Sequence, residues 1–263
     1  MKIVVCIPAR YASTRFAGKV LAQDTGKYLV QHTYEQACKA KRPQRVIIAA
    51  DDERIVEAAR TFGAECVLTS PDHQSGTDRI AEAVRDLDVD IVINVQGDEP
   101  EIDPDHIDYL AELLVENPDY PMATLATPLH EAKYVADPNV VKVVVSSPAR
   151  PVGATPRGCP PYAVYFSRCP IPYDRENGGI GTPDMYLRHL GIYAYRKDFL
   201  LAITALPQTP LEKLEKLEQL RAVENGYPIL VGRIEHPCEG IDTPEQYAAF
   251  VERWNKQEPE GQL

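Results

Sequence analysis

The sequence predicts an α/β fold, with a mixed and mainly parallel sheet that carries helices on both faces. Short apolar runs rich in valine and isoleucine alternate with segments of helical period over the first 130 residues. Short strands rich in these residues suit a parallel sheet that is covered on both faces. A length of 263 residues is enough to bury a substantial core, and we predict a single domain over residues 1–263.

The first half of the chain alternates predicted strands and helices. Gly63 ends one predicted helix, Ser75 and Asp78 form a capping box for the next, and Pro104 suits a first helical turn. Strands are expected at 3–7, 45–50, 65–68 and 90–95, and helices at 28–40, 52–62, 75–87 and 104–115. This order is Rossmann-like.

The second half loses this regular alternation. Residues 147–185 are rich in proline and glycine and predict an irregular excursion, and Thr243 caps the last helix. Leu211, Leu214, Leu217 and Leu220 recur at helical spacing, which predicts one buried helical stripe. Strands are expected at 122–129, 140–146, 162–167 and 190–196.

Composition excludes several classes of protein. A formal charge of -11 argues against general binding to nucleic acid, which requires basic surface. The six cysteines are scattered without a Cys-x-x-Cys pair, so neither a zinc site nor a disulfide framework is expected. No apolar run is long enough to span a bilayer, and the N-terminus does not resemble a signal peptide. We therefore expect a cytoplasmic protein.

The loop at residues 7–19 directly follows the first predicted strand. It holds three cations, Arg10, Arg15 and Lys19, together with the hydroxyls of Ser13 and Thr14, and it contains no carboxylate. Ligands of open α/β sheets bind outside the carboxyl ends of the strands, so this loop suits a polyphosphate. Neither of the common glycine-rich phosphate loops is present. The alternative is a basic loop that is simply solvated.

Two carboxylates are candidate metal ligands. Asp98 follows the predicted strand at 90–95, and the preceding Gly97 would let the backbone approach a ligand closely. Asp242 lies just before the predicted last helix. Magnesium is commonly held by one or two carboxylates together with substrate phosphates. From sequence alone, an acidic turn explains Asp98 equally well, and a favourable interaction with the helix dipole explains Asp242 better.

Further polar residues suit substrate recognition. The segment 69–79 is dense in hydrogen-bonding groups, and Gln74 and Arg79 within it could read a base edge or a ribose. Arg168 and His189 flank strand-like runs. They are either ordinary, partly buried polar residues or the recognition site of an anionic second substrate.

These motifs together resemble the 3-deoxy-manno-octulosonate cytidylyltransferases, also called CMP-Kdo synthetases. The chain departs from the family pattern at Phe16-Ala17, where Leu-Pro is usual, and at Tyr28, where proline is common. The resemblance runs in order through residues 7–19, 73–79, 94–100, 165–168, 188–193, 210–221 and 240–244.

The resemblance implies a nucleotide-diphospho-sugar transferase fold and a homodimer. It also implies that CTP and the sugar acid Kdo react with Mg²⁺ to give CMP-Kdo and pyrophosphate, for lipopolysaccharide biosynthesis. The catalytic residues would be Arg10, Lys19, Asp98 and Asp242, the last two binding Mg²⁺. Arg10, Ser13, Arg15, Lys19, Gln74 and Arg79 would bind CTP, and Arg15, Gln96, Arg168, His189, Tyr193 and Glu212 the sugar acid.

Three alternatives remain open at this point. One is a cytidylyltransferase for another sugar acid, of the 8-amino-Kdo or sialic acid type. Another is a glycosyltransferase of similar fold, which would release a nucleotide rather than pyrophosphate. A non-catalytic nucleotide-binding regulator is the third, but it predicts the loss of Lys19, Asp98 or Asp242, and all three residues are present.

Overall fold

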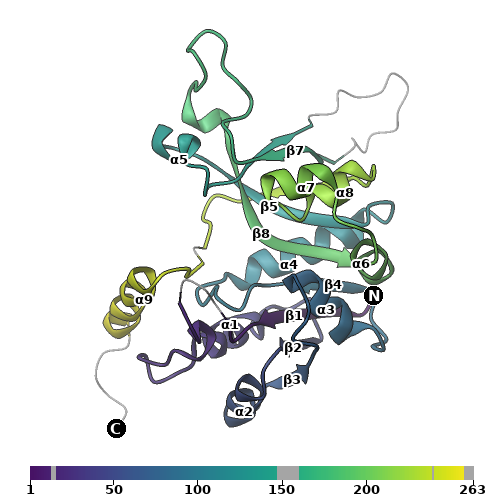
Figure 1. Cartoon of the computed structure of the whole chain (residues 1–263), viewed down its shortest axis with the longest axis vertical. Coiled ribbons are helices and arrows are strands. Elements are labelled where there is room, and N and C mark those ends of the chain that lie inside the picture. Colours follow the sequence, from purple (N-terminus) through teal and green to yellow (C-terminus); the bar gives the residue numbers. More distant parts are fainter. Residues whose placement is uncertain (13–15, 147–159, 239, 258–263) are drawn as a thin grey trace. The chain divides into compact units, whose positions relative to one another are not determined.

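A computed structural model of the chain describes residues 1–12, 16–146, 160–238 and 240–257 (Figure 1). Its contacts divide the chain into two compact units. Unit 1 comprises Met1–Asp108 and Cys238–Leu263, and unit 2 comprises Tyr109–Pro237. The α/β class is confirmed, whereas the single-domain organisation stays a prediction. The first part of the predicted excursion, 147–159, lies outside the described residues.

The strands of unit 1 are parallel and lie in the order β3-β2-β1-β4. All seven residues of β1 are buried, as its unbroken apolar sequence predicts. β1 continues beyond the predicted end through Pro8 to Ala9, while β2 and β3 have the predicted bounds. The strands are β1 (Ile3–Ala9), β2 (Arg45–Ala50), β3 (Glu65–Leu68) and β4 (Ile91–Asn94).

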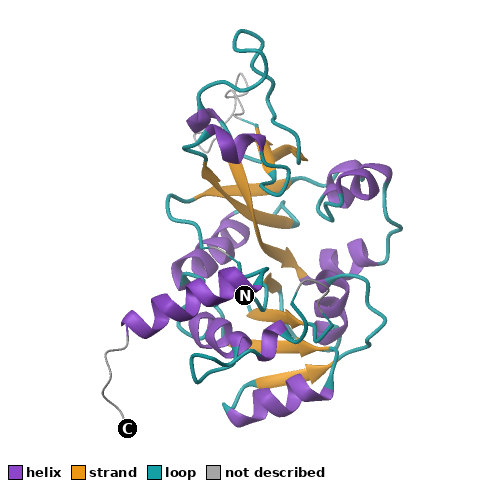
Figure 2. Ribbon diagram, turned by 60° about the vertical axis from the view of Figure 1, so that its left-hand side comes forward, coloured by secondary structure: helices purple, strands orange, loops and turns teal. Residues whose placement is uncertain are grey.

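The helices of unit 1 lie beside its strands (Figure 2), and two of them begin at predicted caps. Ser75 caps its helix, since its Oγ accepts a hydrogen bond from Asp78 N at 3.1 Å. Thr243 Oγ1 likewise accepts from Gln246 N at 3.3 Å, so both predicted caps are confirmed. The helices are α1 (Leu29–Ala37), α2 (Glu53–Thr61), α3 (Gly76–Val84), the start of α4 (Pro104–Glu116), α9 (Pro244–Gln257) and the 3₁₀ turn η1 (Lys19–Leu21).

An apolar cluster holds α9 against the N-terminal part of unit 1. Its buried members are Leu29 of α1 and Ile241, Tyr247 and Phe250 of the C-terminal segment. Phe16 packs against the same cluster, with its ring centroid 5.6 Å from that of Tyr247. Residues more than two hundred positions apart in the sequence are thus fixed together, and Phe16, one of the departures from the family pattern, is part of that contact.

His32 of α1 predicts an acid-sensitive contribution to stability. Its ring lies 4.4 Å from the Trp254 ring and only 3% of the residue is exposed, while Nε2 is 2.7 Å from Thr25 Oγ1. Burial, reinforced by the charge of Lys27, lowers the pKa of His32 to about 4 from the usual 6.5. Between these values the unfolded chain binds a proton that the folded chain does not, so the free energy of unfolding decreases as the pH falls.

We expect urea unfolding to show a weaker loss of stability, from neutral pH to about pH 4, in His32→Phe than in the parent protein. His236→Phe is the matched control because His236 is exposed. Parallel pH dependences for the parent and the His32→Phe variant would contradict the assignment.

The strands of unit 2 pair both parallel and antiparallel. β5 pairs antiparallel with β8 and parallel with β9, and β6 pairs antiparallel with both β7 and β8. β9, α5 and α6 were not among the predicted elements. The strands are β5 (Met122–Pro128), β6 (Lys142–Val145), β7 (Ala163–Ser167), β8 (Leu187–Arg196) and β9 (Ile229–Arg233). The helices are α5 (Ala132–Ala136), α6 (Lys197–Thr204), α7 (Pro210–Glu215) and α8 (Leu220–Glu224), with the 3₁₀ turn η2 (Pro183–Met185).

The prediction of one buried leucine stripe is wrong. Lys216 adopts a left-handed conformation with φ of 55°, which ends α7 before α8 begins at Leu220. Leu217 and Leu220, after the break, are buried, but Leu214 of α7 is 80% exposed. Among the helices of the described residues, none has the length and apolar character needed to cross a membrane.

Candidate functional site

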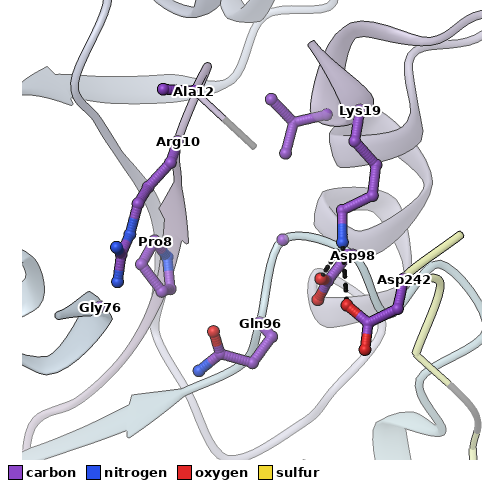
Figure 3. A pocket seen from close by; sticks show the side chains of 10 residues that line it. Pro8, Arg10, Ala12, Lys19, Gly76, Gln96, Asp98 and Asp242 are labelled. Carbon is purple, nitrogen blue, oxygen red and sulfur yellow. Dashed lines mark hydrogen bonds and ion pairs between the residues drawn. The ribbon is translucent and has the colours of Figure 1, made fainter. Parts of the chain in front are cut away.

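A pocket of about 320 Å³ lies in unit 1, where β1 and β4 end. Its position agrees with the expectation that ligands bind at the carboxyl ends of the strands. It brings together five of the predicted site residues: Arg10, Lys19, Gln96, Asp98 and Asp242 (Figure 3). Pro8, Ala12, Val20, Gly76 and Gly97 complete the lining.

The ammonium group of Lys19 connects the two candidate metal ligands. Only 7% of Lys19 is exposed, and Nζ donates to Asp98 Oδ2 at 2.5 Å and to Asp242 Oδ1 at 3.4 Å (Figure 3). A third hydrogen bond, of 2.6 Å, runs from Nζ to the carbonyl of Ile241. One buried cation therefore lies within hydrogen-bond distance of both carboxylates.

Asp242 reaches Asp98 because the segment before α9 is fixed to the turn after β4. Ile241 N donates to Asp98 O at 2.8 Å, and the Ile241 side chain belongs to the apolar cluster under α9. The side chains of Asp98 and Asp242 are 28% and 51% exposed, so both remain accessible to a ligand. Asp242 lies just before the N-terminus of α9, as the helix-dipole interpretation requires. It also accepts a hydrogen bond from the same Lys19 ammonium group as Asp98.

Two glycines allow the segments after β4 and at the start of α3 to approach Pro8 closely. A Cβ on Gly97 would lie 2.9 Å from Pro8 O, and one on Gly76 would lie 3.3 Å from Pro8 Cγ. We predicted that Gly97 serves close approach to a ligand, but the close approach is to the backbone of β1. Pro8 and Gly76 were not predicted as site residues, because their contribution is backbone proximity rather than a functional group.

The exposed Arg10 lies beside Pro8 and Gly76, on the other side of the pocket from Lys19 (Figure 3). Its Nη1 donates to Gln74 O at 3.4 Å. Gln74 is exposed but does not line the pocket, and its side-chain amide donates to Asp72 O at 3.0 Å. Gln96 does line the pocket, and its amide donates to Asn94 Oδ1 at 3.0 Å. The predicted CTP ligands Ser13 and Arg15 lie outside the described residues.

Arg79 is fully buried and does not line the pocket. Its Nη1 donates to Thr69 Oγ1 at 2.6 Å and to Ser70 O at 3.2 Å, and Nη2 lies 3.4 Å from Asp51 Oδ2. Burial lowers the pKa of its guanidinium group. Some of the hydrogen-bond donors in segment 69–79 therefore bind other parts of the fold. Binding of CTP by Arg79 stays a prediction.

Arg168 and His189, two of the predicted sugar-acid ligands, lie in unit 2. The Arg168 guanidinium donates to Glu215 O at 2.7 Å and to Pro138 O at 2.9 Å. His189 is 9% exposed, with Nε2 at 3.2 Å from Thr124 Oγ1. Burial, with a smaller effect of Arg188, lowers the pKa of His189 to about 3, so the ring is neutral at physiological pH.

Tyr193 and Glu212 complete the predicted sugar-acid ligands in unit 2. The Tyr193 ring centroid lies 5.4 Å from that of His189. Glu212 is 4% exposed and accepts two hydrogen bonds from Arg221, from Nη2 at 2.6 Å and from Nε at 2.9 Å. Glu212 Oε2 also accepts from Thr209 N at 3.2 Å, which caps α7. The contacts of Glu212 are those of a structural residue, and its role in binding a sugar acid stays a prediction.

Asp98 and Asp242 are the donor set available to a metal in the pocket. The described residues contain no group of three or more His, Cys, Asp or Glu side chains suited to one ion. A pair of carboxylates is nonetheless sufficient for Mg²⁺, which commonly takes its remaining ligands from substrate phosphates and water. The pocket therefore suits a metal that arrives with a phosphorylated ligand better than one held by the protein alone.

Comparison with known proteins gives consistent matches along the chain. The family model described as "Cytidylyltransferase" matches residues 4–234. The 3-deoxy-manno-octulosonate cytidylyltransferase of Solibacter usitatus is 48% identical over 244 residues, covering 93% of this chain and 91% of that protein. The protein of the same name from Syntrophotalea carbinolica is 48% identical over 250 residues, covering 93% of this chain and 95% of its own.

Solved structures agree with these relatives. A structure described as CMP:2-keto-3-deoxy-manno-octonic acid synthetase complexed with CTP has a TM-score of 0.87 and 38% identity, covering 98% of this chain and 100% of its own. A cytidylyltransferase from Leptospira borgpetersenii has a TM-score of 0.58 at 16% identity, covering 95% of this chain and 85% of its own, and supports the fold alone.

Proposed function

The chain belongs to the cytidylyltransferase family, and we propose that it transfers the cytidylyl group of CTP to the sugar acid Kdo, giving CMP-Kdo and pyrophosphate. The family predicted from the motifs is thereby confirmed. The observation that carries the proposal is the Lys19 ammonium, which two carboxylates share in the pocket where β1 and β4 end. This arrangement suits a phosphate ligand that brings a divalent cation.

In the proposed reaction the anomeric hydroxyl of Kdo attacks the α-phosphorus of CTP. A new bond forms between the hydroxyl oxygen and the α-phosphorus, and the hydroxyl proton is released. The bond from the α-phosphorus to the oxygen that bridges it to the β-phosphorus breaks, so that pyrophosphate leaves. Both substrates are anions, and two unit charges about 4 Å apart repel by roughly 4 kcal/mol at an effective dielectric constant near 20. Arg10, which is exposed in the pocket, offers a forked pair of donors to phosphate oxygens, and Lys19 adds a second positive charge.

Asp98 and Asp242 would hold Mg²⁺. The residues fit the ion, because both carboxylates already lie within hydrogen-bond distance of one cation, the Lys19 ammonium, and both are partly exposed. Bound there, Mg²⁺ would supply positive charge that stabilises the phosphoryl oxygens in the transition state. The carboxylates also orient Lys19 in the pocket, so that its charge is presented at a fixed position.

The remaining roles belong to the same proposal. Ser13, Arg15, Gln74 and Arg79 would assist in binding CTP, and Arg15, Gln96, Arg168, His189, Tyr193 and Glu212 would orient Kdo. Arg168 suits the Kdo carboxylate by the geometry of its guanidinium group. The neutral His189 ring would act through hydrogen bonds rather than charge. The enzyme would act in the cytoplasm as a homodimer, and its product would enter lipopolysaccharide biosynthesis.

Release of pyrophosphate from CTP and Mg²⁺, measured with Kdo, 8-amino-Kdo and sialic acid as acceptors, tests the proposal. We expect the highest kcat/KM with Kdo. Release with sialic acid but not with Kdo would refute the assigned sugar acid. Binding of CTP without turnover of any acceptor would favour the non-catalytic regulator instead.

A further inference from the structure

Lys142, the first residue of β6, carries a buried ammonium group in unit 2. The residue has no exposed surface, and Nζ donates to the carbonyls of Val140 at 2.6 Å, Arg168 at 2.6 Å and Asp137 at 2.9 Å. An ammonium group has three N–H donors, so these bonds use all of them. Burying a charge is costly unless it is well hydrogen-bonded, and here three main-chain carbonyls satisfy it.

Lys142 and the Arg168 side chain bind the same segment, residues 137–140. Lys142 donates to the carbonyls of Asp137 and Val140, and the Arg168 guanidinium donates to the carbonyl of Pro138, which lies between them in the sequence. Lys142 also binds the main-chain carbonyl of Arg168 itself. One ammonium group therefore binds both the main chain of Arg168 and a segment that orients its side chain, in addition to the hydrogen bonds that Arg168 donates to Glu215.

The strand register connects Lys142 with His189 as well. Lys142 pairs with Ser167 of β7 on one side and with Arg188 of β8 on the other. The neighbouring Val141 O accepts a hydrogen bond from His189 N at 2.9 Å. Lys142 thus lies between the strand positions that precede Arg168 and His189, two of the proposed sugar-acid ligands.

We propose that Lys142 is a positioning residue for the sugar-acid substrate, which holds Arg168 in place through the Arg168 carbonyl and the 137–140 segment. The proposal rests on the proposed function, in which Arg168 and His189 orient Kdo. Lys142 itself donates all its hydrogen bonds to the protein and would not touch the substrate. Its loss should therefore weaken binding of the sugar acid and leave binding of CTP intact.

Steady-state kinetics of Lys142→Met test this directly, since methionine keeps the length of the side chain and removes its charge and donors. We expect the KM for Kdo to rise about tenfold or more, while the KM for CTP stays unchanged. Lys133→Met is the matched control, because Lys133 lies on α5 of the same unit with an exposed side chain. Arg168→Met should raise the KM for Kdo, and adding Lys142→Met should raise it little further.

Amide hydrogen exchange of the substrate-free protein gives an independent readout. Lys142→Met should speed exchange at residues 139–141 and 168–169 and leave unit 1 unchanged. If that variant does not fold, Lys142→Gln, which keeps two donors, replaces it in both measurements. An unchanged KM for Kdo, equal increases in both KM values, or unchanged exchange would overturn the proposal. Failure of the proposed function is distinct, because the parent protein would then not turn over Kdo.

Discussion

Asp98→Asn and Asp242→Asn should each reduce turnover of CTP and Kdo by roughly a thousandfold, which corresponds to about 4 kcal/mol of transition-state stabilisation. Asparagine keeps the shape of the side chain and one oxygen but removes the negative charge. Both carboxylates face the same Lys19 ammonium, so either substitution halves the charge available to a divalent cation. Pyrophosphate release at saturating CTP and increasing Mg²⁺ measures the effect.

Asp105→Asn is the matched control, since Asp105 is an exposed acid in the first turn of α4. It should retain the parent rate. Thermal unfolding of all three variants distinguishes a loss of catalytic activity from a loss of stability. This check is needed because Asp98 is also an ion-pair partner of the buried Lys19. A fully active Asp242→Asn variant would show that Asp242 is not part of the proposed metal site. Its role would then be limited to interaction with the dipole of α9.

The parallel strands of unit 1 were predictable because each is a short run dominated by apolar residues. β2 and β3 have the predicted bounds, and β1 differs only at its end, where Pro8 continues the strand. The helical leucine pattern failed for a local reason. A single left-handed residue, Lys216, interrupts the helix, and periodicity contains no information about such a break.

The candidate site was predictable where strand order alone positions a residue. Arg10, Lys19 and Asp98 follow β1 and β4, which are neighbours in the sheet, and all three line the pocket. The partnership of Asp242 with Asp98 depends instead on the packing of α9, through Ile241 and the apolar cluster around it. That contact joins distant parts of the chain, so sequence spacing could not reveal it.

Buried polar residues were the hardest to interpret from sequence. Arg79 and Glu212 are of residue types suited to ligand binding, yet both are hydrogen-bonded within the fold. A sequence shows a charged side chain but not the partner that satisfies it. Glu212 offers the sharper test, because its structural and substrate-binding roles predict different measurements.

Glu212→Ala should lower the free energy of unfolding by about 3–5 kcal/mol, since it leaves the Arg221 guanidinium buried without its carboxylate partner. The two side chains are only 5% and 6% exposed, so water cannot replace the lost hydrogen bonds. The substitution also removes the reciprocal cap of α7, where Glu212 accepts from Thr209 N. Urea unfolding measures the change, and Glu235→Ala, at an exposed position of unit 2, is the control.

The double variant Glu212→Ala, Arg221→Met should recover part of the lost stability, because it removes the buried guanidinium together with its carboxylate partner. Recovery of this kind would assign the cost to the buried guanidinium rather than to a general defect in packing. A different outcome would contradict the structural role: near-parent stability of Glu212→Ala, combined with a raised KM for Kdo alone. Glu212 would then contribute mainly to binding of the sugar acid, and the ion pair with Arg221 would add little to the free energy of unfolding.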